Sequence, residues 1–258
     1  MYKRQASNEG AFDAKAYYFA RGFDFAMEGP ALDRKVCAKR QTAEALWQLG
    51  QRIKEVYLKT MGERDAGILA TMVVGDREFL DAETKRLYQI GGLSHILAIS
   101  GLHISVIGMA LYRMLKKAGL PFGMAALAAA GVMYGYGGMA GWGVSVRRAV
   151  LMFLLFLGAQ VSGRSYDTFC ALAFAAVALL WKNPCLFWDA GFRFSFVAIL
   201  GVVWVGQSIS YEKKGMGALR GKIFAASAVW FTTLPLVAWY FYEIPVYAVF
   251  VNLSLIHI

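Results

Sequence analysis

The sequence predicts an all-α fold: a polytopic membrane bundle of about six to seven spans, preceded by amphipathic helices. Three observations predict it. Hydrophobic residues make up 58% of the 258 residues and charged residues only 17%, against roughly 25% charged residues in soluble domains. Beyond Gly91 the acidic residues are only Asp167, Asp189, Glu212 and Glu243. The same region contains several long runs without charge, and a membrane span needs about 20 apolar residues.

The two ends of the chain resemble translated sequencing-adapter sequence rather than natural protein. Residues 1–5 read Met-Tyr-Lys-Arg-Gln, and residues 253–258 read Leu-Ser-Leu-Ile-His-Ile. Both are expected to be adapter scars, which makes the chain an internal fragment whose natural sequence extends beyond both ends. Removing Lys3 and Arg4 lowers the formal net charge from +10 to +8.

Residues 6–30 and 31–89 precede the apolar region. The first segment is rich in aromatic residues and is expected to be the tail of a preceding domain. The second is expected to be an amphipathic helical region, which would either lie on a membrane surface or pack on the helix bundle. Within it, the apolar run at 68–74 ends at Gly75-Asp76-Arg77, and Asp81 is predicted to cap the next short helix.

Residues 90–252 are predicted to form the transmembrane domain, which the end of the fragment truncates. Its segments without Lys, Arg, Asp or Glu are 91–112, 120–146, 149–163, 168–181, 194–211 and 223–242, and a last helix starts near Pro245. The longer runs meet the length of a span, whereas 149–163 and 168–181 would be short, tilted or surrounded by protein. Six glycines from Gly131 to Gly143 predict close helix packing or a break near the end of the second span.

Positive charge marks one side of the predicted bundle. Twelve Lys and Arg residues follow Gly91 against four acids, a net charge of +8. The loops after the first, third and fifth spans carry Arg113, Lys116, Lys117, Arg164, Lys213, Lys214, Arg220 and Lys222. By the positive-inside rule this side is cytoplasmic, which predicts a multi-pass protein of the cell inner (cytoplasmic) membrane with residues 6–89 outside. A basic surface binds anionic lipid head groups or an anionic polymer, and both stay open here.

One block of polar residues stands out in the first predicted span. Residues 91–105 read Gly-Gly-Leu-Ser-His-Ile-Leu-Ala-Ile-Ser-Gly-Leu-His-Ile-Ser, which resembles the signature of the ComEC competence-protein family. Further blocks similar to the family's pattern, in its order, are Gly75-Asp76-Arg77, Ser145 to Ala149 with Arg148 in the arginine position, Asn183-Pro184 with Asp189 to Phe196, and Thr233-Leu234-Pro235. Ala190 and Arg193 depart from the family's usual Pro and Gln.

This resemblance implies a membrane channel that carries single-stranded DNA across the bacterial cytoplasmic membrane during natural transformation. Its expected partners are single-stranded DNA, membrane lipids, other competence proteins and a cytoplasmic motor. The family often carries an extracellular oligonucleotide-binding-type domain, of which residues 6–30 would be the tail, and a metallo-β-lactamase-like domain. No His-x-His-x-Asp cluster occurs in this sequence, so no nuclease metal site, other enzymatic activity or cofactor is expected in it.

Six polar residues are the candidates for the DNA path: His95, Ser100, His103, Arg148, Asp189 and Arg193. Arg148 would face the pore as a cation or extend to the membrane interface. Arg193 would face the pore or pair with Asp189 four residues earlier. On a helix, His95 and His103 project within about 80° of each other, and Ser100 is spaced to share a hydrogen bond with His103. These three would line the path or join helices by hydrogen bonds.

Two other functions fit parts of this pattern. A secondary transporter for a small anionic solute fits the basic bundle, although few membrane carboxylates are present for proton coupling. An intramembrane hydrolase built on Ser100 and His103 is least favoured, because no third orienting group or oxyanion site is evident.

Tryptophans and cysteines are assigned structural roles. An interfacial aromatic belt is favoured over base stacking for Trp142, Trp181, Trp188, Trp230 and Trp239. The three cysteines match no metal-site spacing and are expected to be packing residues; they are Cys37, Cys170 and Cys185.

Overall fold

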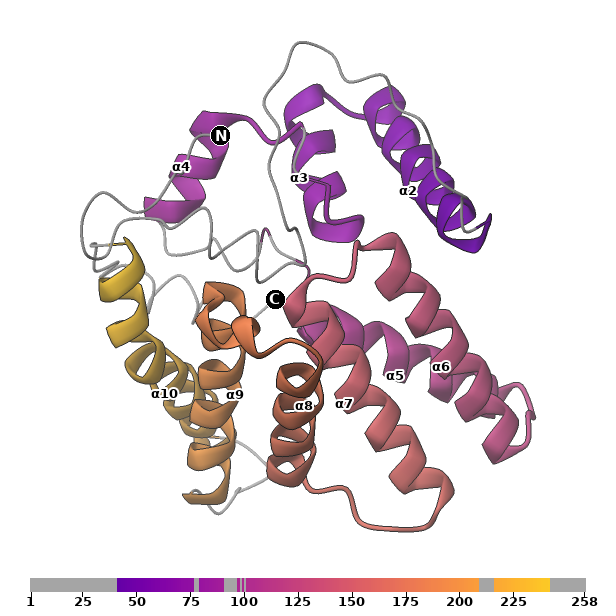
Figure 1. The fold of residues 1–258 in the computed structure, drawn as a ribbon, viewed down its shortest axis with the longest axis vertical. Helices are drawn as coiled ribbons and strands as arrows, with labels where there is room; N and C mark the ends of the chain where they lie inside the picture. Colours follow the sequence, from indigo (N-terminus) through magenta and orange to yellow (C-terminus); the bar gives the residue numbers. More distant parts are fainter. Residues whose placement is uncertain are drawn as a thin grey trace. The chain divides into compact units, whose positions relative to one another are not determined.

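The computed structural model describes residues 41–76, 79–90, 97, 99, 101–208 and 216–241. These residues form helices joined by turns, with no strand among them, which confirms the all-α prediction for this part of the chain. The elements in Figure 1 are α2 (Gln41–Thr60), α3 (Glu63–Val73), α4 (Ala82–Ile90), α5 (Gly101–Lys117), α6 (Phe122–Met139), α7 (Val144–Val161), α8 (Thr168–Lys182), η1 (Pro184–Trp188), α9 (Ala190–Ser208) and α10 (Met216–Phe241). The tail at 6–30 and the helix near Pro245 lie outside the described residues.

The described chain divides into two compact units. The N-terminal unit runs from α2 to Ala175 within α8, and the C-terminal unit runs from Ala176 to the end of α10. The polar block at the start of α5 and Arg148 therefore belong to the first unit, whereas Asp189 and Arg193 belong to the second.

The core of the N-terminal unit lies between α5, α6 and α7. Its buried side chains are Ile99, Ile104, Tyr112, Ala125, Ala126, Ala129, Met133, Val146, Ala149, Val150, Phe153 and Leu157. Small residues let the helices approach closely. At Gly108 of α5, an added β-carbon would lie 2.7 Å from Cζ of the Phe153 ring in α7. The seam between α5 and α7 therefore has no room for a side chain at position 108.

The amphipathic helix α2 packs on the bundle. It contacts α6 and α3, and Figure 1 shows α2 running beside α3. An added β-carbon at Gly138 of α6 would lie 2.8 Å from Cδ1 of Leu46, and one at Gly50 would lie 3.0 Å from Val74. Of the two placements that the sequence left open, the structure has the one in which this helix packs on protein.

Asp81 caps α4, as the sequence predicted. Its carboxylate accepts hydrogen bonds from the Thr84 amide at 3.2 Å and the Glu83 amide at 3.3 Å. These bonds, chiefly the one from Thr84, lower the pKa of Asp81 below its ordinary value. Arg64 of α3 donates from Nε to Thr84 Oγ1 at 2.9 Å, which ties α4 to α3.

A left-handed turn separates α6 from α7. Gly141 has φ +74° and Trp142 has φ +52°, and the Trp142 amide donates to the Gly137 carbonyl at 3.0 Å, as in a Schellman cap. The expected break near the end of the second span is confirmed. The turn ends α6 at Met139, within the uncharged run 120–146 and among the glycines that predicted a break. Arg148 consequently lies in the second turn of α7.

In the C-terminal unit, α9 packs against α10. An added β-carbon at Gly201 of α9 would lie 2.5 Å from Thr232 Oγ1 of α10.

The helix α10 continues through Pro235, which has no amide hydrogen to donate to the preceding turn. Thr233 Oγ1 donates to the Val229 carbonyl at 2.6 Å. The Thr233-Leu234-Pro235 block therefore lies inside a helix, as expected.

One described helix, α7, is both long and apolar enough to cross a membrane, with 18 residues and a mean hydropathy of 1.6. The helix α8 and the Ala190–Trp204 part of α9 are apolar but shorter. Large apolar side chains also point outward on α5 and α6, and those more than half exposed are Val106, Met114, Met124, Leu127, Val132 and Tyr134. Apolar surface of this extent is typical of a face covered by lipid or by a partner.

Replacing Gly108 with Ala is expected to destabilise the N-terminal unit by about 1–3 kcal/mol, because the new methyl group overlaps the buried Phe153 ring. The matched control is Gly131→Ala in α6, where an added β-carbon meets nothing within 4 Å and should be neutral or stabilise by up to about 1 kcal/mol. Thermal unfolding of the detergent-solubilised chain measures both. Equal effects of the two substitutions would contradict the close α5–α7 seam.

Candidate functional site

The Gly75-Asp76 turn after α3 touches both the segment before α5 and the end of α6. Gly75 has φ +82°, a conformation that favours glycine. An added β-carbon there would lie 3.2 Å from Ile99 Cδ1 and 3.3 Å from the Ala140 carbonyl oxygen. The backbone conformation favours glycine at this position, and a β-carbon would also require its neighbours to shift slightly.

Asp76 is held by a buried lysine that the sequence analysis missed. Lys54 Nζ of α2 lies 2.6 Å from Asp76 Oδ2 and 4.3 Å from the centre of the Phe79 ring, and Lys54 is only 5% exposed. Thr71 Oγ1 donates to the Asp76 backbone carbonyl at 2.8 Å. One signal for Lys54 was present: it follows Gly50 by one helical turn on the face of α2 that packs inward.

Arg148 lies inside the bundle near the start of α7. It is 4% exposed, and an added β-carbon at Gly101, the first residue of α5, would lie 2.7 Å from Arg148 Nη2. The guanidinium therefore rests against the backbone where α5 begins. A buried guanidinium does not fit the alternative in which Arg148 extends to the membrane interface.

His103 lies in the first turn of α5 and is partly exposed. His103 is therefore more accessible than Arg148. His95 and Ser100 lie outside the described residues. The polar stripe of His95 with His103, and the hydrogen bond of Ser100 with His103, stay predictions.

Three separate sequence blocks thus meet in the N-terminal unit, at a place that we call the motif junction. The contacts that define it are those of Gly75 with Ile99 and of Gly101 with Arg148. We include His103, which follows Gly101 by two residues in α5. Among the described residues, no group of His, Cys, Asp and Glu could hold a metal ion. What the junction offers is a cation and an imidazole, and both can donate hydrogen bonds to an anion.

Asp189 and Arg193, in the C-terminal unit, make local contacts with backbone and rings. Asp189 is buried, and its Oδ1 accepts a hydrogen bond from the Phe192 amide at 3.0 Å, which caps α9. Arg193 Nε donates to the Phe187 carbonyl at 2.9 Å. The guanidinium carbon of Arg193 lies 4.8 Å from the centre of the Trp188 ring. Of the two placements that the sequence allows for Arg193, the pair with Asp189 is not observed: Asp189 Oδ1 caps α9, and Arg193 Nε is bound to the Phe187 carbonyl.

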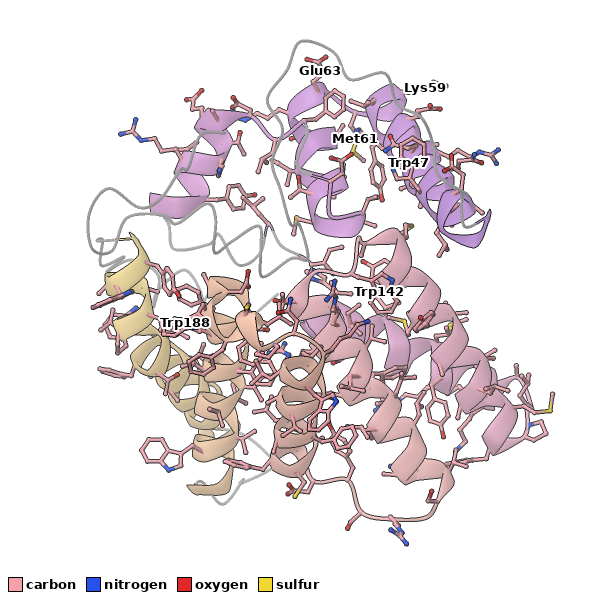
Figure 2. The ribbon with its side chains drawn as sticks, in the orientation of Figure 1. Trp47, Lys59, Met61, Glu63, Trp142 and Trp188 are labelled. Atoms are coloured by element: carbon pink, nitrogen blue, oxygen red, sulfur yellow. The ribbon has the colours of Figure 1, made fainter. Side chains whose placement is uncertain are left out.

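Trp142 closes the turn between α6 and α7 (Figure 2). An added β-carbon at Gly137 would lie 2.9 Å from its ring, and the Tyr134 ring centre is 4.8 Å from that of Trp142. The Trp142 carbonyl accepts a hydrogen bond from Arg147 Nε at 2.6 Å. This residue therefore has a structural role, whereas much more exposed rings belong to Trp181, Trp188 and Trp239.

Cys170 and Cys185 are both free thiols. Cys185 is half-buried, but Cys170 is exposed in the first turn of α8. The prediction that the cysteines are packing residues is therefore wrong for Cys170, and Cys37 lies outside the described residues.

The Competence protein family model matches residues 72–258, which is more than half of the chain and includes the motif junction. The chain belongs to the Competence protein family. The resemblance to ComEC proteins that the sequence blocks carry is thereby confirmed, and proteins of the Competence family are membrane-associated.

Curated relatives place this Competence domain within longer proteins. The chain is 26% identical over 190 residues to ComE operon protein 3 of Bacillus subtilis and 27% identical over 205 residues to Recombination protein 2 of Haemophilus influenzae. It is 28% identical over 196 residues to Competence protein ComA of Neisseria gonorrhoeae. These matches cover 72–74% of this chain but only 24–27% of the relatives, so the chain spans about a quarter of their length. No solved structure matches the chain.

In this Competence domain, Asp76→Ala is expected to destabilise the N-terminal unit by about 3 kcal/mol, because it leaves Lys54 buried without the Asp76 carboxylate. The matched control is Glu55→Ala at an exposed position of α2, expected to change the free energy of unfolding by no more than about 0.5 kcal/mol. Denaturant unfolding in detergent measures both. Combining Lys54→Met with Asp76→Leu should recover most of the loss. An Asp76→Ala effect as small as that of Glu55→Ala would show that the ion pair does not hold the turn.

Proposed function

We propose that this chain is part of a multi-pass domain that carries single-stranded DNA across the bacterial cytoplasmic membrane during natural transformation. The observation that supports it most is the motif junction, where Arg148 is buried against Gly101 at the start of α5 and the partly exposed His103 follows two residues later in the same helix. Charged side chains within spans are rare and usually face a cavity or a partner. The family of the chain, and relatives whose names refer to competence, supply the biological setting.

The charges of α5, α6 and α7 suit a polyanion. These three helices contain no Asp or Glu, and their basic residues are Arg113, Lys116, Lys117, Arg147 and Arg148. A DNA strand is a chain of phosphates whose binding to such a surface weakens steeply with salt. A strand passing along these helices would therefore meet cations and hydrogen-bond donors without like-charge repulsion.

The lengths of the same helices suit a membrane. The helices α5, α6 and α7 have 17, 18 and 18 residues, which at about 1.5 Å per residue approaches a hydrocarbon core of about 30 Å. If α6 returns between α5 and α7, Lys117 at the end of α5 and Arg164 after α7 lie on one side, which the positive-inside rule makes cytoplasmic. The proposal includes about six to seven spans, as the uncharged runs of the sequence predict.

A secondary transporter for a small anionic solute would also need cations that bind an anion, as a DNA channel does. It differs in what crosses the membrane. Flux of a small anion into vesicles that contain the chain, without any uptake of DNA, would favour the transporter.

Arg148→Gln is expected to lower DNA uptake by at least about tenfold, because a charged hydrogen bond is worth roughly 1.5–3 kcal/mol. Arg148→Lys should keep part of the activity. The measurement is transformation of a competent host that lacks its own copy and expresses the gene encoding this chain, with the membrane abundance of each variant checked by immunoblot. The matched control is Arg164→Gln in the exposed turn after α7, which should change uptake less than about twofold. Equal uptake by the Arg148→Gln and Arg164→Gln variants at equal abundance would contradict the proposal.

A further inference from the structure

The C-terminal unit displays a cation stacked on aromatic rings between η1 and α9, which we call the Arg193 platform. It consists of Phe187, Trp188 and Arg193. The guanidinium carbon lies 4.8 Å from the Trp188 ring centre and 5.3 Å from that of Phe187. Trp188, labelled in Figure 2, is 68% exposed, and Phe187 is 51% exposed. The platform therefore offers an accessible aromatic surface beside a fixed positive charge.

The charge of Arg193 is held in place and is not neutralised by its nearest acid in the sequence. Its Nε donates to the Phe187 carbonyl, which leaves the four N–H groups of the two Nη atoms, out of the five in a guanidinium. Asp189 is engaged by the Phe192 amide at the start of α9. The side chain thus lies across the rings with donors left over for an anion.

We propose that the Arg193 platform binds one nucleotide of a single DNA strand. A base would stack on the exposed ring of Trp188, and an adjacent phosphate would accept hydrogen bonds from the Nη atoms of Arg193. Base stacking on an aromatic side chain next to a cation is how proteins hold single strands without reading their sequence. This inference rests on the proposed function and adds to it a specific contact in the other unit of the chain.

A single strand suits this platform better than a duplex or a lipid does. The bases of a duplex stack on one another and present no free face, so only an unpaired base can lie on Trp188. A lipid head group offers a phosphate but no aromatic plane. An arginine that reaches for head groups extends its stem toward them, whereas the Nε of Arg193 is bound to the Phe187 carbonyl.

Binding of two oligomers to the detergent-solubilised chain tests the proposal. One is oligodeoxythymidylate of about 12 nucleotides, and the other is an abasic oligomer of the same length, which keeps the phosphates and lacks the bases. Trp188→Leu should weaken binding of the thymidylate roughly 5- to 100-fold and leave the abasic oligomer unaffected. Trp188→Phe should keep most of the affinity. Arg193→Gln should weaken both oligomers and lower the slope of log affinity against log salt by about 0.7.

The matched control is Trp181→Leu, which removes another exposed tryptophan (89% exposed) of the same unit and should leave both affinities unchanged. Wild-type affinity in Trp188→Leu, with salt-sensitive binding intact, would overturn the platform and leave the proposed function standing. A wild-type chain that binds neither oligomer would overturn both.

A second measurement separates the strand from the lipid. The difference in fluorescence between the wild-type chain and Trp188→Leu in lipid nanodiscs reports on Trp188 alone. Quenching of this difference by added thymidylate supports the proposal. Quenching by brominated lipid, with no response to thymidylate, would make Trp188 an interfacial anchor and overturn it.

Discussion

The burial of Arg148 against the first residue of α5 is the interaction on which the N-terminal unit most depends. A guanidinium in an apolar bundle is expensive to bury, and Nη2 of Arg148 lies close to the backbone at the start of α5. Glycine at position 101 permits that approach, since any β-carbon would overlap Arg148 Nη2. The helix α7 begins at Val144, just after the left-handed turn at Gly141 and Trp142. Arg148, in its second turn, then lies beside Gly101 of α5. The packing of Arg148 against Gly101 thus couples the start of α7 to the start of α5.

The two units use their cations in different ways. Arg148 is buried where helices meet, whereas Arg193 lies across exposed rings at the end of a 3-10 turn. Under the proposed function, Arg148 would act on one fixed point of a DNA strand, and Arg193 would offer a surface on which successive nucleotides can exchange. Transport requires contacts that bind and release. A domain with both kinds of contact meets that requirement better than one with a single tight anion site.

Much of the fold follows from local sequence, and most of what was missed depends on partners distant in sequence. The helical class, the cap at Asp81 and the glycine-rich break after α6 were predicted because each is set by neighbouring residues. The pair of Lys54 with Asp76 joins residues 22 positions apart, which helical periodicity alone cannot connect. The four-residue spacing of Asp189 and Arg193 is compatible with an ion pair. Spacing alone does not show that the helix cap competes for the Asp189 carboxylate.

The most direct measurement is thiol labelling of His103→Cys, in membranes and in a chain whose native cysteines are replaced, using a charged, water-soluble reagent. We expect that the thiol at position 103 is labelled and that single-stranded DNA protects it, since His103 is a partly exposed residue of the motif junction. The comparison is Leu127→Cys on the apolar outer face of α6, which lipid should shield with or without DNA. Labelling at position 127 together with an unreactive or unprotected thiol at position 103 would contradict the account.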